Sequence, residues 1–241
     1  MKYAIISDIH SNLEALQAVL KKVDSIGVDQ ILCPGDIVGY GANPNECIDI
    51  IRDRASVILC GNHDHAAVGS TKIEFFNPHA KEAILWTQEV LRPDCAEFLK
   101  SLPYTASVDG AFFVHSSPCE PEKWNYILQP ADALNEFKCF EGDICFVGHS
   151  HFALVFVKEG DSCERALPSS FQLKKDRRYI VNVGSVGQPR DHSPAASFAT
   201  LEISKEIVQF HRVDYDCHLA CEKILKAGLP SFLAERLLVG E

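Results

Sequence analysis

The chain has 241 residues, 46% of them hydrophobic and 23% charged, which is ordinary for a globular protein with a sizeable core. Its formal net charge of −10 argues against binding to nucleic-acid backbones or anionic membranes, although bound cations would let a small phosphorylated substrate approach. The N-terminal stretch MKYAIISDIHSN lacks the apolar core of a signal peptide, and no run reaches the roughly 20 apolar residues of a membrane span.

Five apolar runs in the first 151 residues each end in a polar cluster that contains Asp, Asn or His. Continuous apolar runs of this length are typical of strands that are buried on both faces. In chain order they are YAIISDIH (3–10), QILCPGD (30–36), SVILCGNHD (56–64), AFFVH (111–115) and ICFVGHSH (144–151).

Helix signals lie between these runs. Ser11 and Glu14 form the pattern of a capping box, and Asn43-Pro44 and Asn77-Pro78 each place a cap before a first-turn proline. The alternation of strands and helices predicts an α/β architecture. Residues 66–100 contain more helix signals than a crossover needs, which is compatible with a small helical lid or with a plain surface pair of helices.

The pattern changes after His151. HFALVFVKEG, RRYIVNVG, ASFATLEIS and EIVQFHRVDY are typical of successive strands, and we expect them to form a second, partly antiparallel sheet. Helix signals return from Asp216 to Glu241. No linker or repeat divides the chain, so we predict a single domain over residues 1–241.

The ten cysteines show no C-x-x-C pair and no framework spacing. Several lie inside apolar runs, for example Cys33 and Cys60. We therefore expect reduced core thiols, a cytoplasmic location and no zinc site built from cysteine.

The polar clusters at the strand ends predict a metal centre. In an extended backbone, residues i and i+2 lie on the same side, so that Asp8 and His10, like His149 and His151, would converge on one point. Ligands of open α/β sheets bind at the carboxyl ends of strands, and one site explains all five clusters together. The candidate ligands mix carboxylate, imidazole and amide groups, which suits two divalent first-row metals. They are Asp8, His10, Asp36, Asn62, His115, His149 and His151.

These residues resemble the motif series of the calcineurin-like metallophosphoesterases. The series is present as Asp8-x-His10, Gly35-Asp36, Gly61-Asn62-His63-Asp64, His115 and Gly148-His149-x-His151. The run NVGSVGQPRD (182–191) further resembles the small bacterial and archaeal phosphodiesterase branch, so that the likeness covers most of the chain. The resemblance implies an α/β fold with a two-sheet β-sandwich of mixed strands flanked by helices, in four αββα layers.

The resemblance also implies roles for the site residues. One metal would be held by Asp8, His10, Asp36 and His151, and the other by Asp36, Asn62, His115 and His149. His63 would protonate the leaving oxygen or stabilise charge there, and Asp64 would orient His63. The cofactor is expected to be two divalent or mixed-valence ions of Mn, Fe, Zn, Ni or Co.

Two further residues are candidates for substrate binding. Arg190 would meet a phosphate through its forked donors, or would be solvated or paired with Asp191. Asn12 follows His10 closely enough to approach the site, and is otherwise a helix-start residue.

We therefore expect a dinuclear-metal-dependent phosphoesterase, and within that class a phosphodiesterase that uses attack by a metal-bridging hydroxide. The motifs do not separate this activity from that of a protein Ser/Thr phosphatase or a dinucleoside tetraphosphate hydrolase, and a noncatalytic scaffold is a further alternative. A nuclease fits poorly, because the acidic chain lacks a basic stripe. We expect a small phosphorylated substrate and no stable nucleic-acid or membrane partner, and the oligomeric state is left open.

Overall fold

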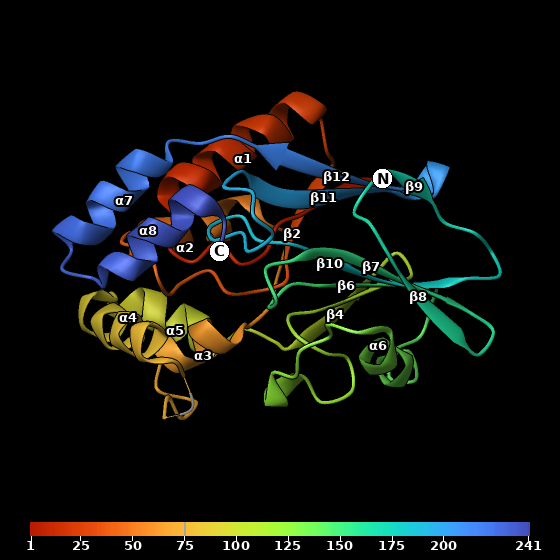
Figure 1. Ribbon diagram of the computed structural model, residues 1–241, viewed down its shortest axis with the longest axis horizontal. Coiled ribbons are helices and arrows are strands. Elements are labelled where there is room, and N and C mark those ends of the chain that lie inside the picture. Colours follow the sequence, from red (N-terminus) through yellow and green to blue (C-terminus); the bar gives the residue numbers. More distant parts are fainter. Residues whose placement is uncertain (75) are drawn as a thin grey trace.

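The structure is a computed structural model that describes residues 1–241 except residue 75, and it contains two β-sheets with helices on their outer faces (Figure 1). The strands of the first sheet are β1 (Lys2–Ile5), β2 (Gln30–Cys33), β3 (Val57–Ile58), β9 (Phe171–Gln172), β11 (Ala196–Glu202) and β12 (Ile207–Val213). Those of the second are β4 (Thr105–Val108), β5 (Ala111–Val114), β6 (Ile144–Val147), β7 (Ala153–Glu159), β8 (Ser162–Ala166) and β10 (Arg178–Val183). Their spatial orders are β3-β2-β1-β11-β12-β9 and β4-β5-β6-β10-β7-β8.

The predicted fold class is confirmed, but the predicted grouping of the later strands is wrong. We expected the strands after His151 to form a sheet of their own. Instead, β10 pairs parallel with β6 and antiparallel with β7, whereas β11 pairs antiparallel with β1. The early strands of each sheet leave an edge of unpaired backbone groups, and the later strands cover both edges.

Helices cover both outer faces of the sandwich and complete the four αββα layers. α1 (Leu13–Ile26) packs on the first sheet and α6 (Pro130–Glu136) on the second (Figure 1). α2 (Pro44–Arg54) and α5 (Pro93–Lys100) belong to the same apolar cluster as α1. α4 (Pro78–Val90), α7 (Cys217–Lys226) and α8 (Ser231–Val239) share a separate apolar cluster. The short helical segments are α3 (Asn62–Ala67), η1 (Pro121–Lys123) and η2 (Ile203–Lys205).

The core between the sheets is built from alternate residues of the strands. In β1, Tyr3 and Ile5 face the second sheet, whereas Ala4 faces α1 and α2. Phe113 and Phe146 from the second sheet stack on each other in this core, with 5.4 Å between ring centroids. Because both faces of β1 are buried, packing fixes the end of this strand and with it the start of the loop that contains Asp8 and His10.

Residues 66–100 include the end of α3, all of α4 and all of α5. The helix α5 is a covering helix, because its Cys95 and Leu99 are buried in the cluster on the outer face of the first sheet. The helix α4 follows a loop near the candidate site described below. That this segment acts as a lid stays a prediction.

The start of α1 differs from the predicted capping box. Asn12, not Ser11, is the N-cap, and its Oδ1 accepts a hydrogen bond from the Ala15 amide at 3.1 Å. Ser11 has a φ of 55°, which is far from the extended conformation that an N-cap residue usually adopts. The predicted caps Asn43 and Asn77 do precede α2 and α4.

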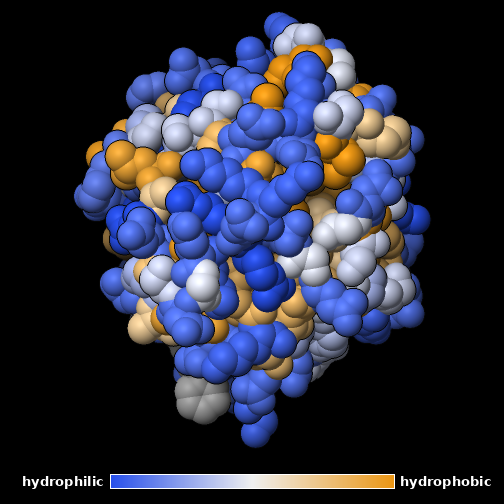
Figure 2. All heavy atoms as spheres, turned by 90° about the vertical axis from the view of Figure 1, so that its right-hand side faces the viewer, coloured by the Kyte–Doolittle hydropathy of each residue, from blue (hydrophilic) through white to orange (hydrophobic). Residues whose placement is uncertain are grey.

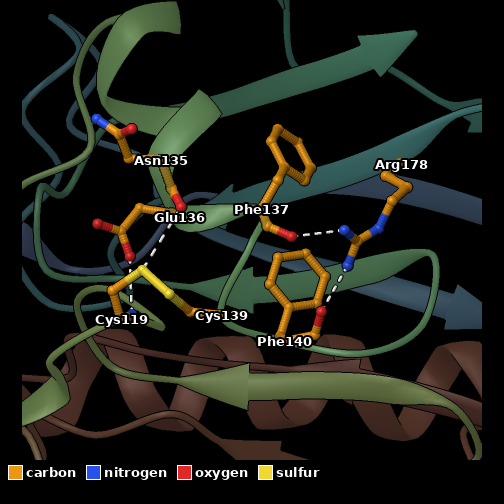
Figure 3. The surroundings of a disulfide bond; sticks show 7 residues. All are labelled: Cys119, Asn135, Glu136, Phe137, Cys139, Phe140 and Arg178. Carbon is orange, nitrogen blue, oxygen red and sulfur yellow. Dashed lines mark hydrogen bonds between the residues drawn. A yellow bond between two sulfur atoms is a disulfide. The ribbon is translucent and has the colours of Figure 1, made fainter. Parts of the chain in front are cut away.

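The prediction that all cysteines are reduced is wrong at two positions. Cys119 and Cys139 form a disulfide with 4.9 Å between their Cα atoms, and the other eight cysteines are free (Figure 3). The chain returns to Cys119 after passing through α6, where the Glu136 carboxylate also accepts a hydrogen bond from the Cys119 amide. A separation of 20 residues carries no pattern that marks a pair in the sequence.

Arg178 holds the turn after α6 in place. Its guanidinium donates to the carbonyl oxygens of Phe137 and Phe140, at 2.5 and 2.7 Å (Figure 3).

The face that contains β8 and β9 is largely hydrophilic, with its apolar side chains in separate small groups (Figure 2). Among the described helices, none combines the length and the hydrophobicity needed to cross a bilayer.

Candidate metal centre

The seven candidate ligands meet at one end of the sandwich, but not in the extended conformation that we predicted. Asp8, His10, His149 and His151 have φ values of 55°, 48°, 67° and 63°, and Asp36 has a φ of 53°. These are left-handed conformations, which cost non-glycine residues roughly 1–3 kcal/mol each. The side chains therefore converge because the loops turn sharply after their strands, and not because alternate residues of a strand share a face.

Hydrogen bonds between the loops hold these turns. The Asp8 and His10 amides donate to the carbonyl oxygens of Gly35 and Asp36, at 3.1 and 3.0 Å. The His149 amide donates to the Asp8 carboxylate at 3.0 Å. The loops after β1, β2 and β6 thus hold one another in place, and these hydrogen bonds stabilise the left-handed backbone at the centre.

The first group of candidate ligands lies around one point. Oxygen and nitrogen atoms of Asp8, His10, Asp36 and His151 all lie within 4.8 Å of one another, and all four residues are buried. His10 Nε2 is 3.5 Å from Asp36 Oδ2, and His151 Nε2 is 3.3 Å from Asp8 Oδ1.

The second group shares Asp36 with the first. Atoms of Asp36, His115 and His149 lie within 4.8 Å of one another, and all are buried. His115 Nε2 is 3.3 Å from Asp36 Oδ2 and 3.2 Å from Asn62 Oδ1. All seven predicted ligands are therefore together, and Asp36 lies where it can serve both groups.

The tautomers of the histidines fit cations at this place. His10 Nδ1 and His151 Nδ1 face the carbonyl oxygens of Val38 and Gln188, at 3.0 and 2.6 Å. A carbonyl can only accept, so both Nδ1 atoms carry the proton of a neutral ring and both Nε2 atoms carry a lone pair. These Nε2 atoms face each other at 2.9 Å, an arrangement that a shared cation between them would stabilise.

In the second group, a backbone carbonyl fixes the tautomer of His149 but not that of His115, whose Nε2 faces Asp36 and Asn62. His149 Nε2 donates to the Trp124 carbonyl at 2.9 Å, which leaves its Nδ1 with the lone pair. Within the described part of the chain, the buried His115 Nδ1 has no hydrogen-bond partner. The donor set of both groups therefore fits divalent metal ions.

Two glycines let the backbone approach the carboxylates. A Cβ atom on Gly61 would lie 2.1 Å from Asp36 Oδ1, and one on Gly148 would lie 2.1 Å from Asp8 Oδ2. Both distances are far inside van der Waals contact, so these positions in the motif require glycine.

The pKa values of Asp36 and His149 favour the forms that bind a cation, whereas that of His115 favours the protonated form. Burial raises the pKa of Asp36, but the nearby His115 and His63 outweigh this effect and hold that pKa well below its usual range. Burial lowers the pKa of His149 to about 3. Burial also lowers the pKa of His115, but Asp36 outweighs it and raises that pKa to about 9. A cation at the second group would therefore displace a proton from His115.

His63 lies beside the two groups and belongs to neither. Its ring packs against Tyr40 and Phe76, with 4.5 and 5.2 Å between centroids. Burial lowers the pKa of His63 to about 4, and its Nδ1 finds no partner among the described residues. The imidazole is thus neutral and held by packing.

The described contacts of the Asp64 carboxylate are with backbone amides and not with His63, so that its role in orienting His63 stays a prediction. Asp64 Oδ1 accepts from the amides of Ile37 and Val38, and its Oδ2 accepts from the Gly61 amide. Burial raises the pKa of Asp64 to about 7. The carboxylate therefore fixes the backbone on both sides of Asp36, because a buried acceptor at the start of α3 satisfies these otherwise unpaired donors.

The two candidate substrate-binding residues, Arg190 and Asn12, have different surroundings in the structure. Arg190 is half-buried and donates to Gln188 Oε1 at 2.9 Å and to the Tyr40 hydroxyl at 3.3 Å. Its predicted alternative partner, Asp191, instead pairs with Arg212. Arg190 lies close enough to lower the pKa of both His63 and His151.

Asn12 is buried behind the site. Its Oδ1 caps α1, and its Nδ2 donates to the Gly187 carbonyl at 2.8 Å. Of the two interpretations that the sequence left open, the structure therefore favours the helix-start residue.

A cavity of about 540 Å³ opens beside the centre. The sequence patterns did not point to three aromatic residues at this place, Tyr40, Trp124 and Tyr126. Only Tyr40 stands near a motif, four residues after Asp36, and single aromatic residues in loops carry no periodic signal. The cavity is lined by Tyr40, Asn62, His63, Thr71, Lys72, Phe76, Asn77, Ala80, Lys123, Trp124, Tyr126 and His149.

Known proteins resemble this chain over most of its length. The family model described as the calcineurin-like phosphoesterase superfamily domain matches residues 1–206. An uncharacterised protein of Methanocaldococcus jannaschii is 42% identical, over 98% of this chain and 97% of that protein. A crystal structure of a metallophosphoesterase from Sphaerobacter thermophilus is 38% identical with a TM-score of 0.87, over 100% of this chain and 99% of the other. A symmetrical bis(5'-nucleosyl)-tetraphosphatase of Actinobacillus pleuropneumoniae is 24% identical, over 74% of this chain and 65% of that protein.

Proposed function

Since the chain belongs to the calcineurin-like phosphoesterase superfamily, we propose that it is a dinuclear-metal-dependent phosphoesterase and, within that class, a phosphodiesterase. One observation carries this proposal. Two buried groups of ligands share Asp36, and the lone pairs of His10 and His151 are directed at the same point by the carbonyls behind each ring.

The seven candidate ligands would divide between two ions. Asp8, His10, Asp36 and His151 would hold one, and Asp36, Asn62, His115 and His149 the other. When bound, two cations of Mn, Fe, Zn, Ni or Co would supply an activated water at neutral pH and would offset charge on the phosphate oxygens. The backbone carbonyls of Val38, Gln188 and Trp124 keep three of the imidazoles in the ligating tautomer.

His63 and Arg190 would act on the substrate itself. His63 lines the cavity next to the centre, and a phosphate anion beside it would raise its pKa and let the imidazole deliver a proton to the leaving oxygen. Arg190 would orient a phosphate oxygen through its guanidinium, which Tyr40 and Gln188 hold in place.

The cavity leaves room for the second ester arm of a diester. A phosphomonoester needs room for one organic group only, whereas about 540 Å³ beside the centre accommodates an additional ester arm. One relative favours a second candidate function, since the protein from Actinobacillus pleuropneumoniae is named a tetraphosphatase that acts on bis(5'-nucleosyl) compounds. That alternative would keep the same residues in the same roles.

An assay of metal-loaded protein tests the proposal. Protein stripped with a chelator is reconstituted with each of the five metals, and turnover of bis(p-nitrophenyl) phosphate is compared with that of p-nitrophenyl phosphate. We expect faster turnover of the diester, and its loss together with the loss of both ions in Asp36→Asn, because one carboxylate serves both groups. The control Asp53→Asn, at an exposed site on α2, should retain turnover and metal. Absence of turnover with every metal, or two ions retained in Asp36→Asn, would contradict the proposal.

A further inference from the structure

The disulfide between Cys119 and Cys139 lies where a reagent in solution can reach it. Cys139 is exposed and Cys119 is half-buried, whereas each of the eight free cysteines is buried or half-buried. Cys119 follows the candidate ligand His115 by four residues, and Cys139 follows α6. The bond is therefore open to a small thiol on the side of Cys139 and is close in sequence to the metal centre on the side of Cys119.

The segment that this disulfide closes, residues 119–139, contacts the second group of candidate ligands. The Trp124 carbonyl accepts the hydrogen bond from His149 Nε2 at 2.9 Å, and Tyr126 stacks on the same imidazole with 4.0 Å between ring centroids. Trp124 also lies beside His115, with 6.1 Å between ring centroids. The orientation of the His149 imidazole therefore depends on where residues 124–126 lie.

The main chain of this segment is weakly attached to the rest of the fold. Among the described residues, all hydrogen bonds between main-chain atoms of residues 119–139 stay inside the segment. Ile127 is buried in the apolar cluster that contains β6, but its neighbours Tyr126 and Leu128 are exposed. The two ends are joined by the disulfide and by the hydrogen bond from the Cys119 amide to Glu136 (Figure 3). Water can replace that hydrogen bond, so the disulfide is the stronger constraint on the segment.

We propose that Cys119 and Cys139 are a redox-active pair that a dithiol reduces in the folded protein, and that this reduction weakens cation binding at the second group of ligands. One thiolate of the dithiol attacks Cys139 Sγ and displaces the Cys119 thiolate, and the second thiolate then attacks the mixed disulfide and displaces the Cys139 thiolate. The dithiol becomes a disulfide and gives up two electrons, and its two protons end on the two cysteines.

Reduction would act on the centre through the His149 imidazole. Once the ends of the segment are free to separate, the Trp124 carbonyl and the Tyr126 ring no longer hold that imidazole in one orientation. Loss of the partner behind a ligating histidine lowers metal affinity roughly 10- to 100-fold. The first group should keep its affinity, because the carbonyls behind its two histidines lie outside the segment. This inference rests on the proposed function, which assigns a cation to each group.

The test measures Mn²⁺ binding to the oxidised and the reduced protein. The metal-free chain is reduced with dithiothreitol, freed of that reagent without oxygen because thiolates bind metals themselves, and titrated with Mn²⁺ in a calorimeter. On reduction, the Kd of one of the two ions should rise about tenfold and that of the other should stay the same. Reoxidation of the same sample should restore the first value, which separates reduction from damage to the fold.

Three variants show whether the effect passes through this pair and this ligand. Cys119→Ser with Cys139→Ser should show the raised Kd with or without dithiothreitol. Cys217→Ser removes a free, half-buried cysteine on α7 and should respond as wild type does. His149→Ala should keep the ion of the first group, and the Kd of that ion should not change on reduction.

Linkage gives a second readout on the wild-type chain. Because coupling between two equilibria is reciprocal, saturating Mn²⁺ should shift the equilibrium between dithiothreitol and the cysteine pair about tenfold towards the disulfide, measured by thiol alkylation and mass spectrometry. If the pair resists dithiothreitol in the folded protein, or is reduced with both Kd values unchanged, the inference is wrong, and turnover of bis(p-nitrophenyl) phosphate would still support the proposed function. If Mn²⁺ binding responds to reduction but no phosphoester is cleaved with any metal, the proposed function fails and the redox-active pair is supported. Protein that binds no pair of Mn²⁺ ions in either form would overturn both.

Discussion

At the scale of single residues, the centre depends on what lies behind each ligand. One ring N–H of each of His10, His149 and His151 donates a hydrogen bond to a backbone carbonyl, and this contact decides which ring nitrogen is left to bind a cation. One of these carbonyls, that of Val38, follows the candidate ligand Asp36 by two residues, whereas those of Trp124 and Gln188 come from segments with no candidate ligand. Ligation and folding are therefore coupled through main-chain atoms, which no side-chain substitution removes directly.

His63 offers the clearest test of a role separate from ligation. His63→Gln should lower kcat by roughly 100- to 10,000-fold, because the imidazole would no longer protonate the leaving oxygen, while two ions per chain remain. Metal content by mass spectrometry and kcat on an aryl phosphodiester measure the two effects separately. His218→Gln, at an exposed position on α7, is the matched control and should change neither value. A parallel loss of metal and turnover in His63→Gln would show that His63 acts through the ligands.

Residue types and order, with the family resemblance, were enough to predict which side chains lie together, but not the way in which they are brought together. All seven predicted ligands lie together, because the motifs follow strands whose ends meet at one edge of the sandwich. The left-handed backbone at Asp8, His10 and Asp36 was not predictable, since it is imposed by hydrogen bonds between loops that are distant in the sequence. For the same reason, the contacts of Asp64 with the amides of residues 37 and 38 were missed.

At the scale of elements, α1 begins where the first metal motif ends. The Asn12 side chain caps the helix and also ties it to Gly187 in the loop before β11. Asn12→Ala should lower the free energy of unfolding by about 2 kcal/mol, since it removes a cap and a second buried hydrogen bond.

Ser11→Ala is the matched comparison for this prediction. Ser11 Oγ is buried and has no hydrogen-bond partner within the described part of the chain, so its removal should leave the free energy of unfolding within about 0.5 kcal/mol of wild type. Urea unfolding of both variants provides the measurement. If Ser11→Ala lowers the free energy of unfolding more than Asn12→Ala does, Ser11 is the N-cap, as the capping-box pattern predicted.

The disulfide between Cys119 and Cys139 closes the segment that contains η1 and α6. Replacing both cysteines with serine should lower the free energy of unfolding by about 3 kcal/mol, because the unfolded chain regains the entropy of a loop of roughly 20 residues. Urea unfolding under oxidising conditions compares this variant with wild type and with Cys163→Ser, which removes a free cysteine on β8. Equal stability of the double variant and wild type would mean that the bond does not stabilise the fold.

At the scale of the whole molecule, the two halves of the sequence are interleaved. The apolar runs up to residue 151 predicted the positions of β1, β2, β3, β5 and β6, and the runs after it predicted β7, β10, β11 and β12. Which sheet each later strand joins was not predictable, because strand pairing depends on contacts between residues far apart in the chain, such as Ile5 with Ala199 and Ile180 with Cys145. The loops of the centre therefore follow strands whose sheets are completed by strands from the later half of the chain.

The stability of this interleaved fold should depend on pH through His211, on β12. Its ring stacks on Phe198 of the neighbouring strand β11, with 4.6 Å between centroids, and its Nε2 lies 3.0 Å from the Thr200 hydroxyl. Burial lowers the pKa of His211 to about 4, and the charges of Lys22 and Lys2 add to this effect. Because the unfolded chain takes up the proton at higher pH, the contribution of His211 is complete above its ordinary pKa of 6.5 and is lost as the pH falls towards 4.

His211→Gln removes this titration and keeps a polar group near Thr200. Between pH 7 and pH 4.5, wild-type protein should lose about 1 kcal/mol more of its free energy of unfolding than the variant does, a value reduced for the partial exposure of the ring. Urea unfolding at both pH values measures the difference, and comparing two proteins with the same metal ligands cancels the titration of the centre. His218→Gln should follow wild type, since that side chain is exposed on α7. If wild type and His211→Gln lose the same free energy of unfolding between the two pH values, the titration of His211 does not cause the acid sensitivity of the fold.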